Sequence, residues 1–389
     1  MGSNVALVKV APDAEGEAVH QALTSALDLL GGPAEFCSPR ETVLVKPNFS
    51  GPHQDVAVSP PVTAATLRIL SDTGCRVLVG EDPSVSVPEE EVYEFFGLHD
   101  AARAAGAEVV SLRHGPHVLV DVPDAGCFEA IEVSQFARDA GLVVSLARMK
   151  AVNICHVTLS LKNMKGVIAP AWKRRFHCDD LNQGIVDLNR VVRPRLAIVD
   201  AIRATDCNAG KTVPVGLLLA GNDCVAVDAV CTRIMGFDPY DVEHIALAEE
   251  AGLGTADPDR IEVLGESLEG VMGRHVFAPP ANPFELAAQS GGGIRIVQGR
   301  PCSACLNELG GALAQFQDRL HEFKDVVVLV GPDAAPPDGQ DRRLLVGNCL
   351  ERRQEEGTYV AGCPPCLFPP AGTGSLTDAL SNLLETQAS

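Results

Sequence analysis

The chain has 389 residues, a formal net charge of −20 and 13 cysteines, and 46% of its residues are apolar. At roughly 150 residues per domain, this length predicts two or three domains, each with an apolar core. The acidic balance excludes nucleic acid as the expected partner, because nucleic-acid binding needs a basic face. No apolar run approaches the roughly 20 residues of a membrane span, and no secretory signal is visible. We therefore expect a cytoplasmic protein with reduced thiols instead of a disulfide framework.

Short apolar strands alternate with amphipathic helices through the first 278 residues. Strands are predicted over 5–10, 42–46, 76–80, 108–112, 141–146, 196–200, 215–220 and 261–264. Helices are predicted over 16–30, 61–73, 88–96, 180–192, 223–236 and 241–252. This alternation is typical of an α/β fold with an open, mostly parallel sheet and helices on both faces. We expect residues 1–278 to form the substrate domain, as one body or as two lobes near 1–140 and 141–278.

Prolines and a run of three glycines mark residues 279–300, which we interpret as a linker. The α/β pattern then restarts. Helices are predicted over 304–322 and 374–386, and strands over 325–330 and 343–347. Residues 301–389 are therefore expected to form a small, cysteine-rich α/β domain.

Five cysteines of this last segment fall at the ends of predicted elements: Cys302, Cys305, Cys349, Cys363 and Cys366. Because the carboxyl ends of parallel strands meet at one edge, three loops carrying thiols can surround one metal centre there. Four thiolates suit a [4Fe–4S] cluster or a tetrahedral zinc ion. A dithiol without metal is the remaining alternative.

The spacing of these cysteines resembles the cluster-binding fold of the hydrogenase small subunit and of the related quinone-reductase subunit. The resemblance rests on Cys302 and Cys305 as a C-x-x-C pair, Cys349 in a glycine-containing loop, and Cys363 in the segment GCPP. It implies that these four residues ligate a [4Fe–4S] cluster, with Cys366 as an alternative ligand. Whether three or four cysteines bind it stays open.

The other eight cysteines are scattered through apolar stretches and are interpreted as small buried residues. Two doublets, Cys155 with His156 and His177 with Cys178, could instead ligate a second metal, although their spacing does not make them converge.

A basic segment without Asp or Glu lies between Asp139 and Asp179 in this acidic chain. It contains two histidines, His156 and His177, and seven cationic residues: Arg148, Lys150, Lys162, Lys165, Lys173, Arg174 and Arg175. A solvated basic loop is the simple interpretation. The alternative is a site for a phosphate or carboxylate, which ammonium groups and the amide of Asn163 would suit. A lysine in such a site can have a lowered pKa and act as a base or nucleophile.

Polar residues also follow several predicted strands, where α/β proteins bind their ligands. They are Lys46, Asn48, Glu81 and Asp200. Asp223 precedes a predicted helix and is expected to be its N-cap, and Asp228 is expected to be a buried structural acid.

These motifs together resemble the uncharacterised family known as domain of unknown function 362. The resemblance spans about residues 5–255 and rests on KPN at 46–48, SLKNMKG at 160–166, His177, LAIVD at 196–200 and GNDCVAVDAV at 221–230. It implies an iron–sulfur association, since members often carry ferredoxin-like cysteine runs. This chain has no such run, and the five cysteines between Cys302 and Cys366 are expected to replace it as the cluster ligands.

We therefore expect an iron–sulfur enzyme that acts on a small anionic molecule, with the cluster as a Lewis acid or a one-electron carrier. Lys162, Lys165 and His177 are the predicted catalytic residues. The predicted substrate-binding residues are Lys46, Asn48, Glu81, Asn163 and Asp200. An electron-transfer or redox-sensing module that docks on a partner protein, such as an electron donor, is one alternative. A zinc-stabilised enzyme without redox chemistry is the other.

Overall fold

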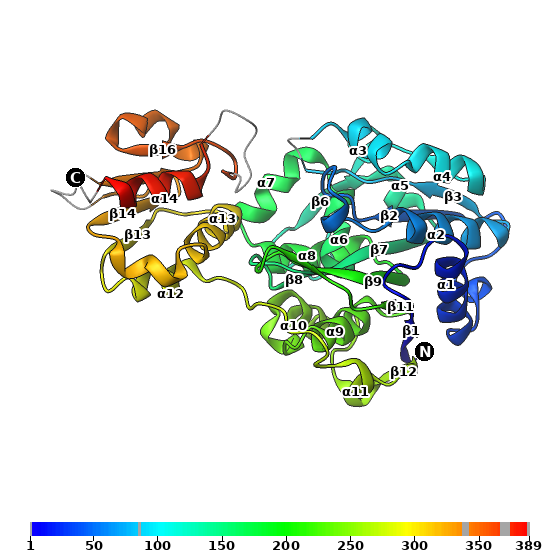
Figure 1. The fold of residues 1–389 in the computed structure, drawn as a ribbon. Helices are drawn as coiled ribbons and strands as arrows, with labels where there is room; N and C mark the ends of the chain where they lie inside the picture. Colours follow the sequence, from blue (N-terminus) through cyan, green and yellow to red (C-terminus); the bar gives the residue numbers. More distant parts are fainter. Residues whose placement is uncertain (1, 85–86, 337–341, 366–373, 387–389) are drawn as a thin grey trace. The chain divides into compact units, whose positions relative to one another are not determined.

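The computed structural model describes residues 2–84, 87–336, 342–365 and 374–386. The chain divides into two compact units (Figure 1). Unit 1 comprises Met1–Phe176 and Asn182–Ala278, and unit 2 comprises His177–Leu181 and Pro279–Ser389. Within the described residues, no helix is long and apolar enough to cross a membrane.

Unit 1 is built on a ten-stranded sheet with the order β12-β1-β11-β9-β7-β2-β3-β4, to which β8 and β10 add as short antiparallel partners of β7 and β9. The strands are β1 (Ser3–Lys9), β2 (Thr42–Pro47), β3 (Arg76–Val79), β4 (Glu108–Val109), β7 (Leu142–Ala151), β8 (Val157–Thr158), β9 (Leu196–Asp206), β10 (Lys211–Val213), β11 (Leu217–Gly221) and β12 (Ile261–Gly265). The strands β9, β7, β2, β3 and β4 are parallel, whereas β11 is antiparallel to both of its neighbours.

The helices of unit 1 connect these strands. They are α1 (Glu17–Leu29), α2 (Pro60–Asp72), α3 (Glu89–Phe95), α4 (Leu98–Ala105), α5 (Gln135–Asp139), α6 (Ser160–Asn163), α7 (Pro170–Cys178), α8 (Leu181–Val191), α9 (Cys224–Ile234), α10 (Glu243–Glu250) and α11 (Leu268–Val271). Asp223 is the N-cap of α9, as expected, and its side chain accepts hydrogen bonds from the backbone N–H of Val225 and Ala226. α2 begins with Pro60, whose fixed φ suits the first turn of a helix.

Helices cover both faces of this sheet. Val43 and Val45 of β2 pack in one apolar cluster with α1 and α2. Leu44 points to the opposite face because strand side chains alternate, and it is also fully buried. α6 and α9 contact β7 and β11. The α/β class and the mostly parallel sheet predicted from the sequence are confirmed.

Unit 1 differs from the sequence predictions in detail. β7 and β9 extend beyond the predicted 141–146 and 196–200, because their later residues are buried as well. A hairpin of β5 (His117–Asp121) and β6 (Ala130–Ser134) was not predicted; β5 is largely exposed, although its sequence HVLVD contains a short apolar run. One sheet contains strands from both halves of the unit, so the two lobes considered from the sequence are not separate layers.

Unit 2 contains a parallel sheet of four strands with the order β13-β14-β15-β16. The strands are β13 (Ile294–Gln298), β14 (Val326–Val330), β15 (Arg343–Val346) and β16 (Thr358–Val360), and the helices are α12 (Pro283–Gln289), α13 (Ser303–Ala314) and α14 (Leu376–Glu385). These helices pack on one face of the sheet, and the 3₁₀ segment Asn348–Glu356 packs on the other.

The segment 279–300 is not a linker, in contrast to the sequence interpretation. It forms α12 and the edge strand β13, whose residue Ile294 is buried in the core of unit 2. Its prolines and glycines lie at the ends of these elements, where Pro283 is the first residue of α12. The predicted helix over 304–322 is α13 followed by a separate 3₁₀ segment, Gln317–Glu322.

Candidate functional site

Three predicted substrate-binding residues meet at the carboxyl ends of β2 and β3 in unit 1. Lys46 Nζ donates hydrogen bonds to Glu81 Oε2 at 2.5 Å and to Asn163 Oδ1 at 2.7 Å. The amide of Asn163 in turn donates to the backbone oxygen of Lys46 at 3.0 Å. All three side chains are buried. The structure therefore brings together residues from three segments, as parallel strand ends allow.

Lys46 and Glu81 compensate each other electrostatically. Burial lowers the pKa of Lys46 and raises the pKa of Glu81, and the attraction between the two groups opposes both shifts. Phe49 N–H also donates to the Glu81 carboxylate at 3.1 Å. This lysine has its own acidic partner, so it does not require an external anion.

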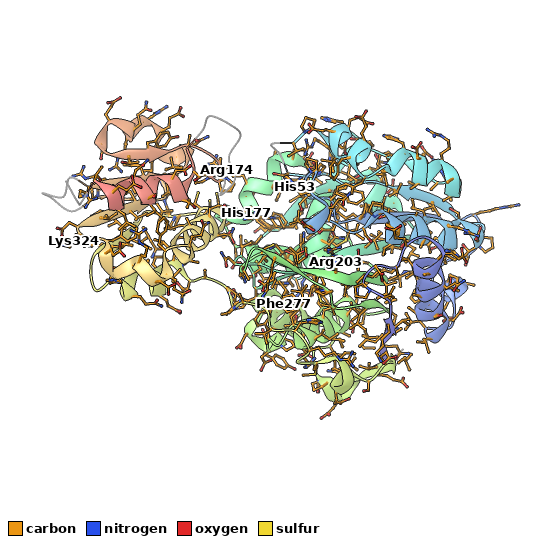
Figure 2. All side chains as sticks on the ribbon, viewed as in Figure 1. His53, Arg174, His177, Arg203, Phe277 and Lys324 are labelled. Carbon is orange, nitrogen blue, oxygen red and sulfur yellow. The ribbon has the colours of Figure 1, made fainter. Side chains whose placement is uncertain are left out.

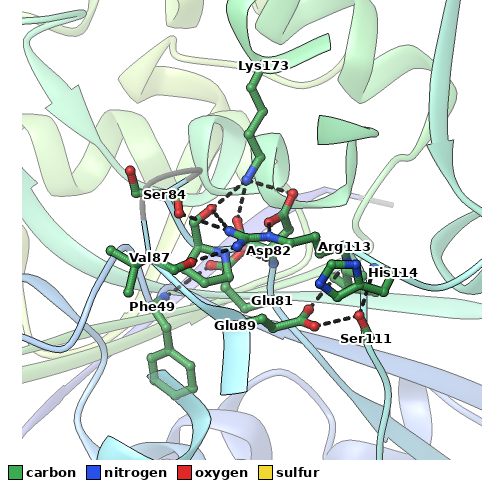
Figure 3. Close-up of polar contacts among 12 residues, drawn as sticks. Phe49, Glu81, Asp82, Ser84, Val87, Glu89, Ser111, Arg113, His114 and Lys173 are labelled. Atoms are coloured by element: carbon green, nitrogen blue, oxygen red, sulfur yellow. Dashed lines mark hydrogen bonds and ion pairs between the residues drawn. The ribbon is translucent and has the colours of Figure 1, made fainter. Parts of the chain in front are cut away.

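A second set of ion pairs lies directly beside this one and is called here the Asp82 network: Asp82, Arg113 and Lys173 (Figure 3). Arg113 Nε lies 2.6 Å from Asp82 Oδ1, and Lys173 Nζ lies 2.7 Å from Asp82 Oδ2. Both cations also donate to the backbone oxygen of Pro83. The network therefore fixes the loop that follows β3 and carries Glu81.

Asp200 and Asn48 occupy the same edge with different surroundings. Asp200 is fully buried, pairs with Arg148 at 3.3 Å and accepts a hydrogen bond from Ser59 N–H at 2.9 Å. Asp200 thus compensates a cation and anchors the loop after β2. The side-chain oxygen of Asn48 is buried, and within the described residues it has no hydrogen-bond partner.

The lysine cluster, defined as Lys150, Lys162 and Lys165, differs from these pairs. Lys150 Nζ donates to the backbone oxygen of Val56 at 2.7 Å, and Lys162 Nζ donates to that of Ile154 at 3.1 Å. The described part of the chain offers neither Lys150 nor Lys162 a carboxylate within ion-pair distance.

Burial and mutual repulsion act together in this cluster. Burial, and next the neighbouring ammonium of Lys162, lowers the pKa of Lys165 to about 7. Burial also lowers the pKa of Lys150 to about 8 and that of Lys162. Lys165 additionally lies 5.9 Å from the centre of the Phe176 ring. The cluster thus gathers one buried and two half-buried lysines in a chain that is acidic as a whole.

His177, the third predicted catalytic residue, belongs to unit 2 and not to the unit that carries Lys162 and Lys165. It lies in the last turn of α7 (Figure 2). Its Nδ1 lies 3.0 Å from the hydroxyl of Ser303, which lies between Cys302 and Cys305 in the sequence. The structure therefore associates His177 with the thiols of unit 2.

Four of the described cysteines of unit 2, Cys302, Cys305, Cys349 and Cys363, gather at the carboxyl edge of its parallel sheet. Cys302 is the N-cap of α13 after β13, Cys349 follows β15 and Cys363 follows β16. The hydrogen bond to Cys302, then burial and the charges of Cys302, Cys349 and Cys363, raise the pKa of Cys305. The same Cys305 thiol, with backbone N–H groups, lowers the pKa of Cys302 to about 6.

Four thiols on three loops are thus electrostatic neighbours, which is the donor set that the sequence predicts. Cys366, the alternative ligand, lies outside the described residues. In the ranges that the structure describes, no group of three or more His, Cys, Asp or Glu side chains is arranged to hold a metal ion. The fit of these residues to a metal centre therefore rests on the chemistry of the donor set and on the three converging loops.

Several residues of the unit 1 edge were not predicted as site residues. Asp82 directly follows Glu81, which its position after a predicted strand had indicated as a site residue. Lys150 and Lys173 lie in the acid-free segment between Asp139 and Asp179. Arg113 comes from a loop without a motif. His244 of α10 is fully buried next to Lys162, and neither ring nitrogen has a hydrogen-bond partner among the described residues. No sequence signal distinguishes it from a core histidine.

The fold and this edge define an α/β protein with a polar site at the carboxyl ends of parallel strands. Residues 43–233 match the model of the family described as domain of unknown function (DUF362). This match confirms the predicted family resemblance over that segment, which contains Lys46, Glu81, the lysine cluster and Asp228. The cysteines of unit 2 lie outside it.

Two individual proteins are similar to parts of the chain. The thylakoid-associated protein sll1697 of Synechocystis sp. is 28% identical over 251 residues, which cover 61% of this chain and 77% of that protein. Among solved structures, the lactate racemase apoprotein from Thermoanaerobacterium thermosaccharolyticum matches 60% of this chain and 56% of its own, with a TM-score of 0.39 and 12% identity. The chain therefore spans little more than half the length of that structure.

Proposed function

We propose that the protein is an iron–sulfur enzyme that binds a small anion at the lysine cluster of unit 1. The observation that carries this proposal is that Lys150 is buried and Lys162 is half-buried, and that neither has a carboxylate partner in the described residues. An uncompensated buried charge costs several kcal/mol, so such an arrangement is favourable where a ligand supplies the opposite charge. Phosphate and carboxylate groups are the anions that ammonium groups bind in proteins.

The lysines of the cluster would have two different roles, anion binding and proton transfer. Lys150 and Lys162 would hold the anion through charge-assisted hydrogen bonds. Lys165, with a pKa near 7, is suited to give or take a proton on the bound molecule near neutral pH. The pair of Lys46 and Glu81 would form the adjoining polar wall, with Asn163 fixing the lysine.

In unit 2, Cys302, Cys305, Cys349 and Cys363 would hold a [4Fe–4S] cluster. When bound, such a cluster supplies one-electron transfer, or a Lewis-acidic iron if one thiolate is missing. A cysteine-only donor set is also compatible with zinc, which would make the metal structural. The identity of the donors and their position on three loops at one sheet edge support the cluster.

A second candidate function, an electron-transfer or redox-sensing module, is favoured by the accessibility of these thiols. Cys349 and Cys363 are exposed and Cys302 is half-buried, whereas only Cys305 is buried. A cluster on such residues would lie near the surface of unit 2, where a partner protein can exchange electrons with it. A cytoplasmic location remains a proposal, and the name of the cyanobacterial relative associates that protein with the thylakoid.

The metal part is tested by purification without oxygen, followed by iron, sulfide and zinc analysis and EPR. We expect brown protein with about four irons and four sulfides per chain. Cys349→Ser should bleach the visible absorption, because it removes a proposed ligand. Cys75→Ser, which changes a thiol of unit 1, is the matched control and should keep the colour. Colourless protein with one zinc per chain would instead support the zinc alternative.

The anion part is tested by calorimetric titration with inorganic phosphate and sulfate. Lys162→Met should weaken binding about 10- to 100-fold, since loss of one charge-assisted contact costs about 1.5–3 kcal/mol. Lys324→Met, which changes an exposed lysine of unit 2, should leave the affinity unchanged. Equal affinity of wild type and Lys162→Met would contradict the assignment of the cluster as the anion site. Turnover with bound substrate then separates the enzyme from the electron-transfer module.

A further inference from the structure

The β5–β6 hairpin of unit 1 has an open edge. Among the described strands, β5 (His117–Asp121) pairs with β6 alone, and the far side of β6 is bridged at Val133 to Ile168. Leu119, at the centre of β5, is 62% exposed, and the neighbouring Val118 is exposed as well. An edge strand with exposed apolar side chains is a template for pairing with a further strand.

The hydrogen bonds at the two ends of the hairpin fix which pairs of the ladder are hydrogen-bonded. Gln135 N–H donates to the oxygen of Pro116 at 2.8 Å. Val122 N–H donates to the oxygen of Glu129 at 2.9 Å. Hydrogen-bonded and non-hydrogen-bonded pairs alternate along an antiparallel ladder, so every second residue of β5, starting with the first, belongs to a non-hydrogen-bonded pair.

The backbone groups of these residues point to the open edge. Leu119 lies opposite Glu132, whose oxygen accepts a hydrogen bond from Ala169 N–H on the far side of β6. Leu119 and Glu132 therefore face away from each other with their N–H and C=O groups. The same holds for His117 and Asp121 at the ends of the strand. Three residues of β5 thus present a donor and an acceptor each to an additional strand.

The sequence of β5 is complementary to itself in the antiparallel direction. In a pairing of two copies about a two-fold axis at Leu119, His117 of one copy lies opposite Asp121 of the other, and Val118 lies opposite Val120. The first pair joins a basic to an acidic side chain, and the second joins two β-branched apolar side chains, which are favourable cross-strand pairs. A register shifted by two residues would instead place Leu119 opposite Asp121.

The groove beside this strand carries both signs of charge. It is lined by β5 and α5 and contains Arg138 and Asp139 together with His117 and Asp121. An anionic partner, such as a nucleic acid or an acidic lipid surface, would meet two carboxylates here. A second copy of the same surface can offer an opposite charge to each sign, as an interface between identical chains about a two-fold axis requires.

We propose that β5 is the contact strand of a two-fold symmetric homodimer, in which two copies of the chain form an antiparallel sheet with the order β6-β5-β5-β6 and His117 opposite Asp121. This proposal is independent of the anion site and of the metal centre. The pairing gives partners to the outward N–H and C=O groups of β5 and brings the two exposed Leu119 side chains together. It also extends a two-stranded hairpin to a sheet of four strands, which is more stable.

Sedimentation equilibrium of the full chain, purified without oxygen and kept in a thiol reductant, tests the proposal. A strand edge is a small interface, so we expect a dimer that dissociates on dilution and that approaches twice the 40.9 kDa of one chain at about 200 µM. Leu119→Lys should raise the dissociation constant about tenfold or more, because it places two ammonium groups opposite each other. The control Val276→Lys, at an apolar residue of unit 1 that is 83% exposed, should leave the dissociation constant unchanged.

Two further variants separate the interface from the fold of the monomer. Leu119→Pro removes an N–H that does not bond to β6, so it should weaken the dimer while the circular dichroism spectrum and the melting temperature stay near those of wild type. His117→Asp should also weaken the dimer, and His117→Asp combined with Asp121→His should restore it, since the opposite pairs are exchanged in this register. A monomeric wild type at about 200 µM would overturn the proposal and leave the edge to another partner. A dimer that survives both Leu119 variants would overturn it as well.

Discussion

The Asp82 network and the lysine cluster lie at the same edge of one sheet and are built from the same kinds of residue. Both contain buried or half-buried cations. In the network, Arg113 and Lys173 share the carboxylate of Asp82, whereas among the described residues Lys150 and Lys162 donate to backbone oxygens alone. Burial and position at a strand end therefore do not by themselves mark a ligand site. A counter-charge that is missing from the described residues distinguishes the proposed anion site from the ion-paired network that fixes the loop after β3.

The largest effect should follow from breaking the compensated region. Asp82→Asn leaves two cations without their carboxylate, and we expect a loss of about 3–5 kcal/mol in the free energy of unfolding. Urea denaturation measures this loss. The matched control is Asp100→Asn, which breaks an exposed pair with Arg103 and should cost less than about 1 kcal/mol. A similar small loss for both variants would show that the network does not depend on its carboxylate.

Removing a charge from the uncompensated region should have the opposite sign. Lys162→Met replaces a half-buried ammonium by an apolar side chain of similar length, and we expect the ligand-free protein to gain about 1–2 kcal/mol. Urea denaturation without phosphate measures the gain, and repeating it with phosphate should diminish the advantage, because wild type is stabilised by binding. A destabilised variant would mean that Lys162 already has a counter-charge in the free protein.

The pH dependence offers a smaller and sharper distinction. The pKa of Lys165 is about 7 in the folded chain, against about 10.4 for an unperturbed lysine. Between these values the unfolded chain binds the additional proton, so stability should rise with pH by up to about 1.4 kcal/mol per pH unit. Phosphate affinity should fall over the same range. Lys165→Met should flatten the stability profile between pH 7 and 9, and a profile that keeps its slope would contradict the assignment.

Much of the fold was predictable because short apolar runs, of three residues in β2 and β3 and five in β14, define the strands. β2, β3 and β14 correspond closely to the predicted 42–46, 76–80 and 325–330. β5 contains a Val-Leu-Val run like that of β2 but is largely exposed, and β13 has turn residues on both sides, so the apolar run alone does not identify every strand. Their strand conformation depends on pairing with a neighbour, which a single sequence does not contain.

The candidate site was predictable to a similar extent. Strand-end position was sufficient to select Lys46, Glu81 and Asp200, and the acid-free segment was sufficient to select Lys162 and Lys165. Which cations are compensated was not predictable, because Arg113 reaches Asp82 from a loop about 30 residues away and the partner of Arg148 is Asp200, 52 residues on. Such pairings are set by tertiary packing alone. The roles of these residues remain predictions.

The short segment His177–Leu181 has a consequence for how the two units could be separated. It belongs to unit 2, yet it interrupts unit 1 in sequence and falls inside the stretch that matches the DUF362 family. A truncation after residue 278 would therefore deprive this segment of the rest of its unit, including the Ser303 partner of His177. Neither unit is one continuous segment of the chain. A single gene fusion or a single truncation would therefore not add or remove the whole of unit 2, which carries the clustered thiols. The two units are thus expected to be inherited together.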